Sequence, residues 1–98
     1  MSTIKLLPWD IDLGYPQWQR VIISGKAYTL FYSWNLNDFP VLKIVRAEDE
    51  SIIFNEKLVK DNPREVKDPT TYEVLFTILP RKIEKDDLEI WLFEENQT

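Results

Sequence analysis

Residues 18–34 read WQRVIISGKAYTLFYSW, and this stretch decides the fold class. Two apolar runs, 18–24 and 27–34, flank Gly25, whose permissive backbone suits the tight turn of a hairpin. In the second run large side chains alternate with smaller or more polar ones, which is the period of a half-buried strand. We therefore predict an antiparallel hairpin whose core side carries Tyr28, Leu30, Tyr32 and Trp34.

The same alternation recurs along the rest of the chain, in short segments separated by turn residues. We expect further strands at 40–46, 51–59, 72–79 and 88–93, and a short one within residues 4–9. The core sides of the later strands are predicted to carry Leu42 and Ile44, then Tyr72, Val74, Phe76 and Ile78, then Leu88, Ile90 and Leu92. Loops are expected at residues 10–16, 35–38 and 60–71.

The region around Pro80 is the ambiguous part of the pattern. Proline cannot donate a backbone hydrogen bond to a ladder, so Pro80 is expected to end the 72–79 strand. Residues 81–87 suit either a helical turn or an extended chain, and both interpretations stay open. The pattern as a whole predicts a single all-β domain over residues 1–98, a small antiparallel β-sandwich or partly open barrel of about six to seven strands, with room for one short helical turn.

Composition excludes most familiar catalytic chemistry. The 98 residues include no Cys and no His, so thiolate nucleophiles, histidine general bases and the commonest metal ligands are missing. Acidic residues in the predicted turns do not follow the twelve-residue calcium-loop pattern, and two glycines are too few for a phosphate-binding loop. We therefore predict a protein that is not an enzyme, with no catalytic residues, no metal and no cofactor.

The charge balance bears on the partner. The chain has 12 basic and 17 acidic side chains and a net charge of −5, which disfavours binding to a nucleic acid backbone. No apolar run approaches the roughly 18 residues that span a bilayer. We therefore expect no nucleic acid partner and no membrane partner.

Aromatic side chains are the best candidates for contact with a partner. Four Trp and four Tyr could serve as core, as a hot spot for a protein or as a stacking platform for sugars. Residues 28, 32 and 34 lie on the alternating face and are assigned to the core. Trp9, Tyr15 and Trp18 lie in or beside a proline-containing loop, where packing needs them less, and they are the predicted partner-binding residues.

Several features between residue 16 and about residue 59 recur together in one family. They are Pro16-Gln17 opening a strand, Gly25 in the first turn followed by Tyr28, the run 28–32 closing on Trp34-Asn35, the turn at Asp38-Phe39, the alternation from Val41 to Val45, and a short segment ending in Leu58. In these features the chain resembles the baseplate plug proteins of tailed bacteriophages, small domains of about this length. The resemblance covers a little under half of the chain.

The resemblance implies a structural or adaptor protein of a bacteriophage tail tip or baseplate that works by protein–protein contact. Its partners would be other virion proteins, copies of itself among them, and its location would be the virion after synthesis in the host bacterial cytoplasm. The resemblance supplies no catalytic residue. Two alternatives stay open: a carbohydrate- or receptor-binding module, and a small phage protein that binds a host factor.

Overall fold

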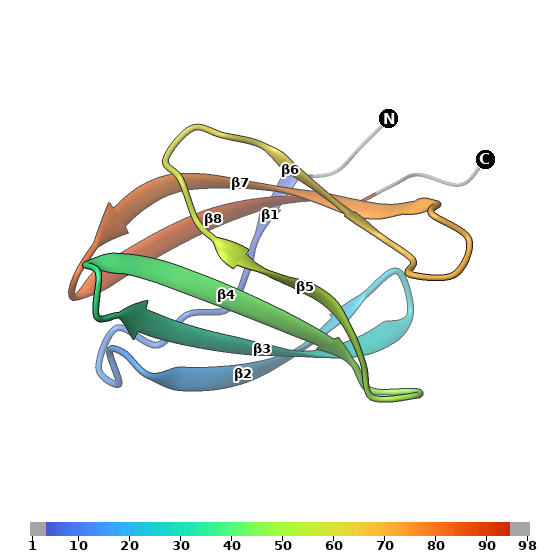
Figure 1. Ribbon diagram of the computed structural model, residues 1–98, viewed down its shortest axis with the longest axis horizontal. Coiled ribbons are helices and arrows are strands. Elements are labelled where there is room, and N and C mark those ends of the chain that lie inside the picture. The colour runs from blue at the N-terminus through green and yellow to red at the C-terminus, as the bar shows by residue number, and fades with distance from the viewer. Residues whose placement is uncertain (1–3, 95–98) are drawn as a thin grey trace.

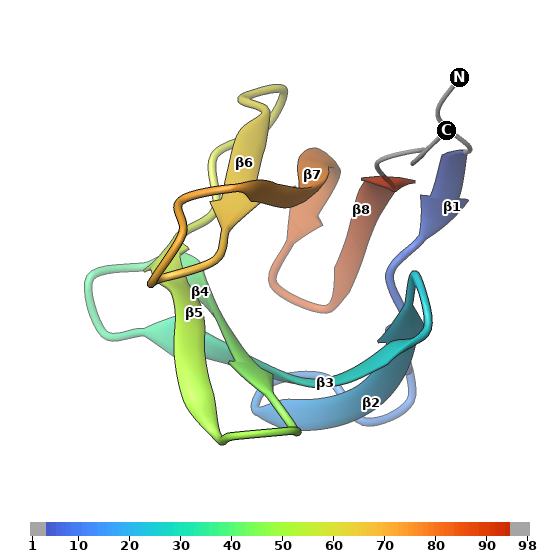
Figure 2. The same cartoon turned by 90° about the vertical axis from the view of Figure 1, so that its right-hand side faces the viewer.

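The computed structural model describes residues 4–94, which form eight β-strands and no helix (Figure 1). The strands are β1 (Ile4–Leu6), β2 (Gln17–Ile23), β3 (Lys26–Asn35), β4 (Phe39–Arg46), β5 (Ser51–Lys57), β6 (Arg64–Lys67), β7 (Val74–Glu84) and β8 (Asp87–Glu94). They make two four-stranded antiparallel sheets that pack face to face, as Figure 2 shows from the side. The predicted β-sandwich is confirmed.

The two sheets differ in how the chain builds them. The first, called the meander sheet, joins β2, β3, β4 and β5 in chain order. The second, called the terminal sheet, has the order β1-β8-β7-β6 and so pairs the first strand with the last. An ion pair between Arg64 and Glu56 links β6 to β5 at one side of the sandwich.

The predicted hairpin forms as β2 and β3. Ile23 pairs with Lys26, and the two turn residues between them, Ser24 and Gly25, both have positive φ angles, 51° and 81°. Positive φ at both central positions is the geometry of the turn that matches the twist of paired strands, and glycine adopts it without strain. The turn therefore fixes the register that directs Tyr28 and Tyr32 inward.

The core lies between the inner faces of the two sheets. The predicted inward residues of β4 and β8 are buried, as are Phe76 and Ile78 of β7. Tyr28 of the meander sheet meets Phe76 of the terminal sheet edge to face, with ring centroids 5.4 Å apart and an interplanar angle of 74°. Trp34 lies at the margin and is half-buried. This packing removes most of the large apolar side chains of the inner faces from water.

The sequence pattern misses one strand and assigns one exposed residue to the core. The predicted loop 60–71 contains β6, whose single apolar residue, Val66, is fully buried. A four-residue strand with one apolar side chain among charged ones shows no alternation, which is why the predicted strand number of six to seven falls short of eight. Tyr72 is not a core residue, because β7 begins only at Val74 and Tyr72 stands in the preceding turn with a φ of 63° and its side chain exposed.

The prediction that Pro80 ends its strand is also wrong. β7 continues to Glu84, and its register with β8 shifts between Pro80 and Lys82. Such a bulge leaves one residue unpaired and tolerates a proline that cannot donate to the ladder. Residues 81–87 are therefore extended chain with a tight turn, and the alternative of a helical turn does not apply.

Arg46, at the end of β4, ties the two sheets together. Its Nη1 donates to Asp68 Oδ2 at 2.7 Å, and its Nε and Nη2 donate to the two carboxylate oxygens of Asp49. Asp68 follows β6 and also accepts hydrogen bonds from the backbone N–H groups of Thr70 and Thr71. The Arg46 guanidinium, aided by these two donors, lowers the pKa of Asp68 to about 2.

This contact makes the free energy of unfolding depend on pH in the acid range. The pKa of Asp68 is lower in the folded state than the value of about 3.9 in an unfolded chain, so the unfolded state binds more protons between these values. The stabilisation by Asp68 is present above about pH 4 and is lost as the pH falls toward 2. We expect the urea midpoints of wild type and Asp68→Asn to differ at neutral pH and to converge across that window. Midpoints that run parallel from pH 6 to pH 2 would contradict this assignment.

Candidate functional site

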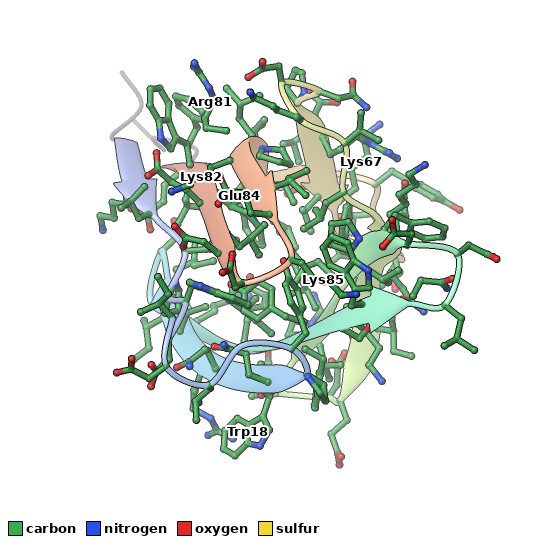
Figure 3. The ribbon with its side chains drawn as sticks, turned by 90° about the vertical axis from the view of Figure 1, so that its left-hand side faces the viewer. Trp18, Lys67, Arg81, Lys82, Glu84 and Lys85 are labelled. Carbon is green, nitrogen blue, oxygen red and sulfur yellow. The ribbon has the colours of Figure 1, made fainter. Side chains whose placement is uncertain are left out.

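The three predicted partner-binding residues do not come together. Trp9 and Tyr15 pack against the core, with ring centroids 4.8 Å apart, and their rings also contact Tyr32 and Trp34 respectively, each at 5.2 Å. Burial, with a smaller contribution from the Asp87 carboxylate, raises the pKa of Tyr15 to about 12. Trp18 instead lies on the outer side of the meander sheet with 61% of its surface exposed. Figure 3 shows it projecting away from the body of the sandwich.

The loop that carries Trp9 and Tyr15 is tied to the start of β2 by the buried side chain of Gln17. Gln17 Nε2 donates to the carbonyl oxygens of Asp10 and Gly14, and its Oε1 accepts from the Asp10 N–H at 3.0 Å. The Tyr32 hydroxyl donates to the carbonyl oxygen of residue 8 at 2.7 Å. Trp9 and Tyr15 thus belong to a fixed aromatic cluster that closes one end of the core, and Trp18 is the predicted candidate whose ring is open to solvent.

The outer face of the meander sheet surrounds Trp18. Along β2 the exposed side chains of Trp18, Arg20 and Ile22 alternate with inward ones. The strand register places one row across all four strands, in the order Trp18, Phe31, Lys43 and Asn55. A second row beside it runs Arg20, Thr29, Val45 and Ile52.

This outer face is unusually apolar for a surface that meets water. Besides Trp18, it leaves Ile22 69%, Ile52 55% and Phe31 37% exposed. Apolar side chains that gather on one exposed face mark an interaction surface more often than scattered single residues do. The patch lies over β2, β3 and β5, so it belongs to the sheet and not to a loop.

Two hollows lie side by side in the outer face. The first has a volume of about 460 Å³ and is lined by Trp18, Ser33 and Asn55, among others. The second, of about 510 Å³, is lined by side chains of the second row together with Glu50 of the β4–β5 turn. Phe31 and Lys43 line both hollows, and Lys43 Nζ lies 4.8 Å from the centroid of the Phe31 ring. The Phe31 ring and the Lys43 ammonium over it therefore separate the two hollows.

The charge of the outer face is opposite to that of the whole chain. Its described strand residues include three cations, Arg20, Lys43 and Lys57, and no carboxylate. Glu56 belongs to the other side of β5, where it pairs with Leu42 in register and with Arg64 as an ion pair. The strand residues of this face therefore carry a net positive charge in a chain whose net charge is −5.

Sequence reasoning missed the remainder of this surface, above all Phe31 and Lys43. A usable signal was present, because the predicted outward side of residues 27–34 already carried a phenylalanine. Likewise, the outward side of 40–46 carried Val41 and Val45 beside Lys43. The solvent-facing side of an antiparallel sheet is normally polar, so apolar side chains on that side indicate a contact surface.

Residues 4–94 offer no metal-binding cluster and no membrane-spanning helix, since they bring together no group of three or more acidic side chains that could hold a metal ion and none of their segments is a helix suited to crossing a bilayer. Comparisons of the chain with protein families, with curated proteins and with solved structures find no match. The outer face of the meander sheet is thus the feature whose chemistry points to a function.

Proposed function

We propose that the protein is a non-enzymatic binding protein that holds a protein partner on the outer face of the meander sheet. The observation that carries this proposal is the row Trp18, Phe31 and Lys43, an exposed aromatic pair and a cation set side by side across three strands. Tryptophan and arginine dominate the energetics of protein interfaces, and Arg20 stands next to this row. A partner that covers this row removes apolar surface from water, which stabilises the complex by about 25 cal/mol for each Å² buried.

We further propose that the partner is a virion protein and that the chain is a structural or adaptor component of a bacteriophage tail tip or baseplate. The support for this role is the resemblance to baseplate plug proteins. The resembling residues, 16 to about 59, include all four strands of the meander sheet and so the whole outer face. The proposed binding surface and the resemblance therefore fall on the same part of the chain.

The test is retention of the tagged protein on phage particles. Lysate from phage-infected cells and purified virions are probed for the tagged protein and for the proteins that copurify with it. We expect the wild type in virions beside a neighbouring virion protein, and Trp18→Ala to be lost from them. Absence of the wild type from virions, together with capture of a host protein, would favour the host-factor alternative instead.

A carbohydrate-binding module is the second candidate, and the first hollow favours it. Its wall combines the exposed Trp18 ring, on which a sugar could stack, with the polar side chains of Ser33 and Asn55. Tryptophan fluorescence measured during titration with cell-wall glycans separates the two. A spectral shift that disappears in Trp18→Phe would support sugar binding, and an unchanged spectrum would leave the protein partner as the occupant.

A further inference from the structure

Strand β2 forms an open edge of the meander sheet. It pairs with β3 on one side and, among residues 4–94, with no strand on the other (Figure 1). The other borders offer less room, because β1 and β6 have three and four residues and β5 is linked to β6 by the ion pair of Arg64 with Glu56. The β2–β3 ladder has no register shift, and β2 contains no proline. The edge therefore lacks the short length, the bulge and the proline that commonly protect edge strands.

The hairpin turn determines which backbone groups of β2 bond to β3. Ile23 and Lys26 flank the two-residue turn as a hydrogen-bonded pair, and such pairs occur at every second position of an antiparallel ladder. The preceding residue of β2, Ile22, lies opposite Ala27. The Ala27 carbonyl oxygen accepts a hydrogen bond at 3.0 Å from the N–H of Ala47, which follows β4, so its backbone groups face β4. The backbone groups of Ile22 therefore point away from β3.

Two more residues of β2 turn their backbone groups to the open edge. Arg20 and Trp18 precede Ile22 at intervals of two residues, so their N–H and C=O groups also point away from β3. No other backbone group among residues 4–94 bonds to them. Unpaired donors and acceptors at this spacing match those of an extended chain, which can add to the sheet as a further strand.

The side chains of the same three residues lie on the outer face and are exposed. Arg20 carries the only charge among them, and its direct neighbour on β3, Thr29, is uncharged. No carboxylate among residues 4–94 forms an ion pair with Arg20, and Glu50, which lines the second hollow with it, is no exception. A strand beside β2 would thus meet a cation between two apolar side chains.

We propose that an extended segment of the protein partner adds to β2 as a further strand of the meander sheet, with a carboxylate beside Arg20 and apolar side chains beside Trp18 and Ile22. This inference rests on the proposed function, because the added strand extends the same outer face. Backbone hydrogen bonds hold the segment, and cross-strand side-chain pairs select its sequence. The segment therefore reads apolar, any residue, acidic, any residue, apolar, an order that is the same in both chain directions.

A second copy of β2 suits this edge less well than an acidic segment does. The antiparallel register that pairs all three open residues would set Arg20 opposite Arg20 of the other copy. Like charges directly opposite each other destabilise a strand pair, whereas opposite charges stabilise it. The charge of the edge thus favours a partner with a different, acidic strand.

Synthetic peptides test the predicted segment. One labelled peptide has the sequence Thr-Thr-Val-Thr-Glu-Thr-Val-Thr-Thr, and a matched peptide has Lys in place of Glu. Fluorescence anisotropy is measured with the full chain up to millimolar concentration. We expect the Glu peptide to bind about tenfold more tightly than the Lys peptide. Arg20→Ala should abolish this preference, and Lys60→Ala, which removes a cation from an exposed loop, should retain it.

Methylation of the peptide backbone separates strand addition from contact through side chains alone. Successive amides of an added strand face β2 and solvent in turn, so N-methyl groups on the Val and Glu amides and on the amides between them should differ. One set should abolish binding and the other should be tolerated, while the protein itself is unchanged. If both sets are tolerated, or if the Glu and Lys peptides bind equally, the proposed strand addition is wrong.

The binding face and the added strand can fail separately. If no peptide binds, while the wild type is retained on virions and Trp18→Ala is lost from them, the binding face stands and the strand addition is overturned. Sedimentation velocity shows whether the chain pairs with itself. Dimers that the Glu peptide dissociates would overturn the acidic partner in favour of a second copy.

Discussion

Phe76→Ala should lower the free energy of unfolding by about 3–5 kcal/mol, the largest effect on stability that we expect from one substitution. Phe76 is fully buried and comes from the terminal sheet, and its ring meets that of Tyr28 from the meander sheet. Alanine removes the transfer free energy of the ring and leaves a cavity between two sheets whose backbones are held by their ladders. Aromatic contact between the sheets is lost as well.

The matched control is Phe31→Ala, which removes the same ring from the outer face of β3. This ring is 37% exposed and its loss opens no internal cavity, so we expect a change below about 1 kcal/mol. Denaturant unfolding followed by near-ultraviolet circular dichroism measures both variants. If the two substitutions lower the free energy of unfolding by the same amount, Phe76 does not pack in the interior between the two sheets.

Trp18→Ala should weaken binding at the outer face by at least about thirtyfold while leaving the fold intact. Truncating an aromatic hot-spot residue of an interface costs about 2 kcal/mol or more, and Trp18 is the most exposed ring of the row that continues through Phe31 and Lys43. Its exposure of 61% means that little of its ring supports the core. The amount of tagged protein retained on purified phage particles, compared with the urea midpoint, separates binding from folding.

Leu36→Ala is the control for this second prediction. Leu36 lies in the turn between β3 and β4 and is fully exposed, so the substitution removes apolar surface outside the proposed interface. We expect binding equal to that of the wild type. Loss of binding in both variants would point to general hydrophobic adhesion, and a Trp18→Ala protein that loses binding and stability together would place Trp18 among the supports of the fold.

Much of the fold could be predicted from local pattern. The hairpin at Gly25 and the buried sides of β3, β4 and β8 follow from alternation with period two and from the backbone that the turn demands. The strand β6 could not be predicted, because Val66 is its single apolar residue and only the pairing with β7 shows that this side chain is buried. The continuation of β7 past Pro80 depends on a bulge, and a bulge is a property of two strands together.

The candidate site was less predictable for a related reason. Alternation tells which side of a strand carries Trp18, Phe31 and Lys43, but only the register between strands sets them in one row. Trp9 and Tyr15 look equivalent to Trp18 in the sequence, and the anchoring of their loop by Gln17 decides that they pack inward. Neither the register between strands nor the anchoring of a loop by a neighbouring side chain has a signature in the alternation of a single sequence.

The chain order of the two sheets sets a sequence of events during synthesis. The meander sheet is built from neighbouring segments and ends at Lys57, so its hairpins close over short loops as soon as they emerge from the ribosome. The terminal sheet must wait for β8, because β1 pairs only with that strand among residues 4–94. A nascent chain therefore completes the meander sheet before the terminal sheet is there to cover its inner face.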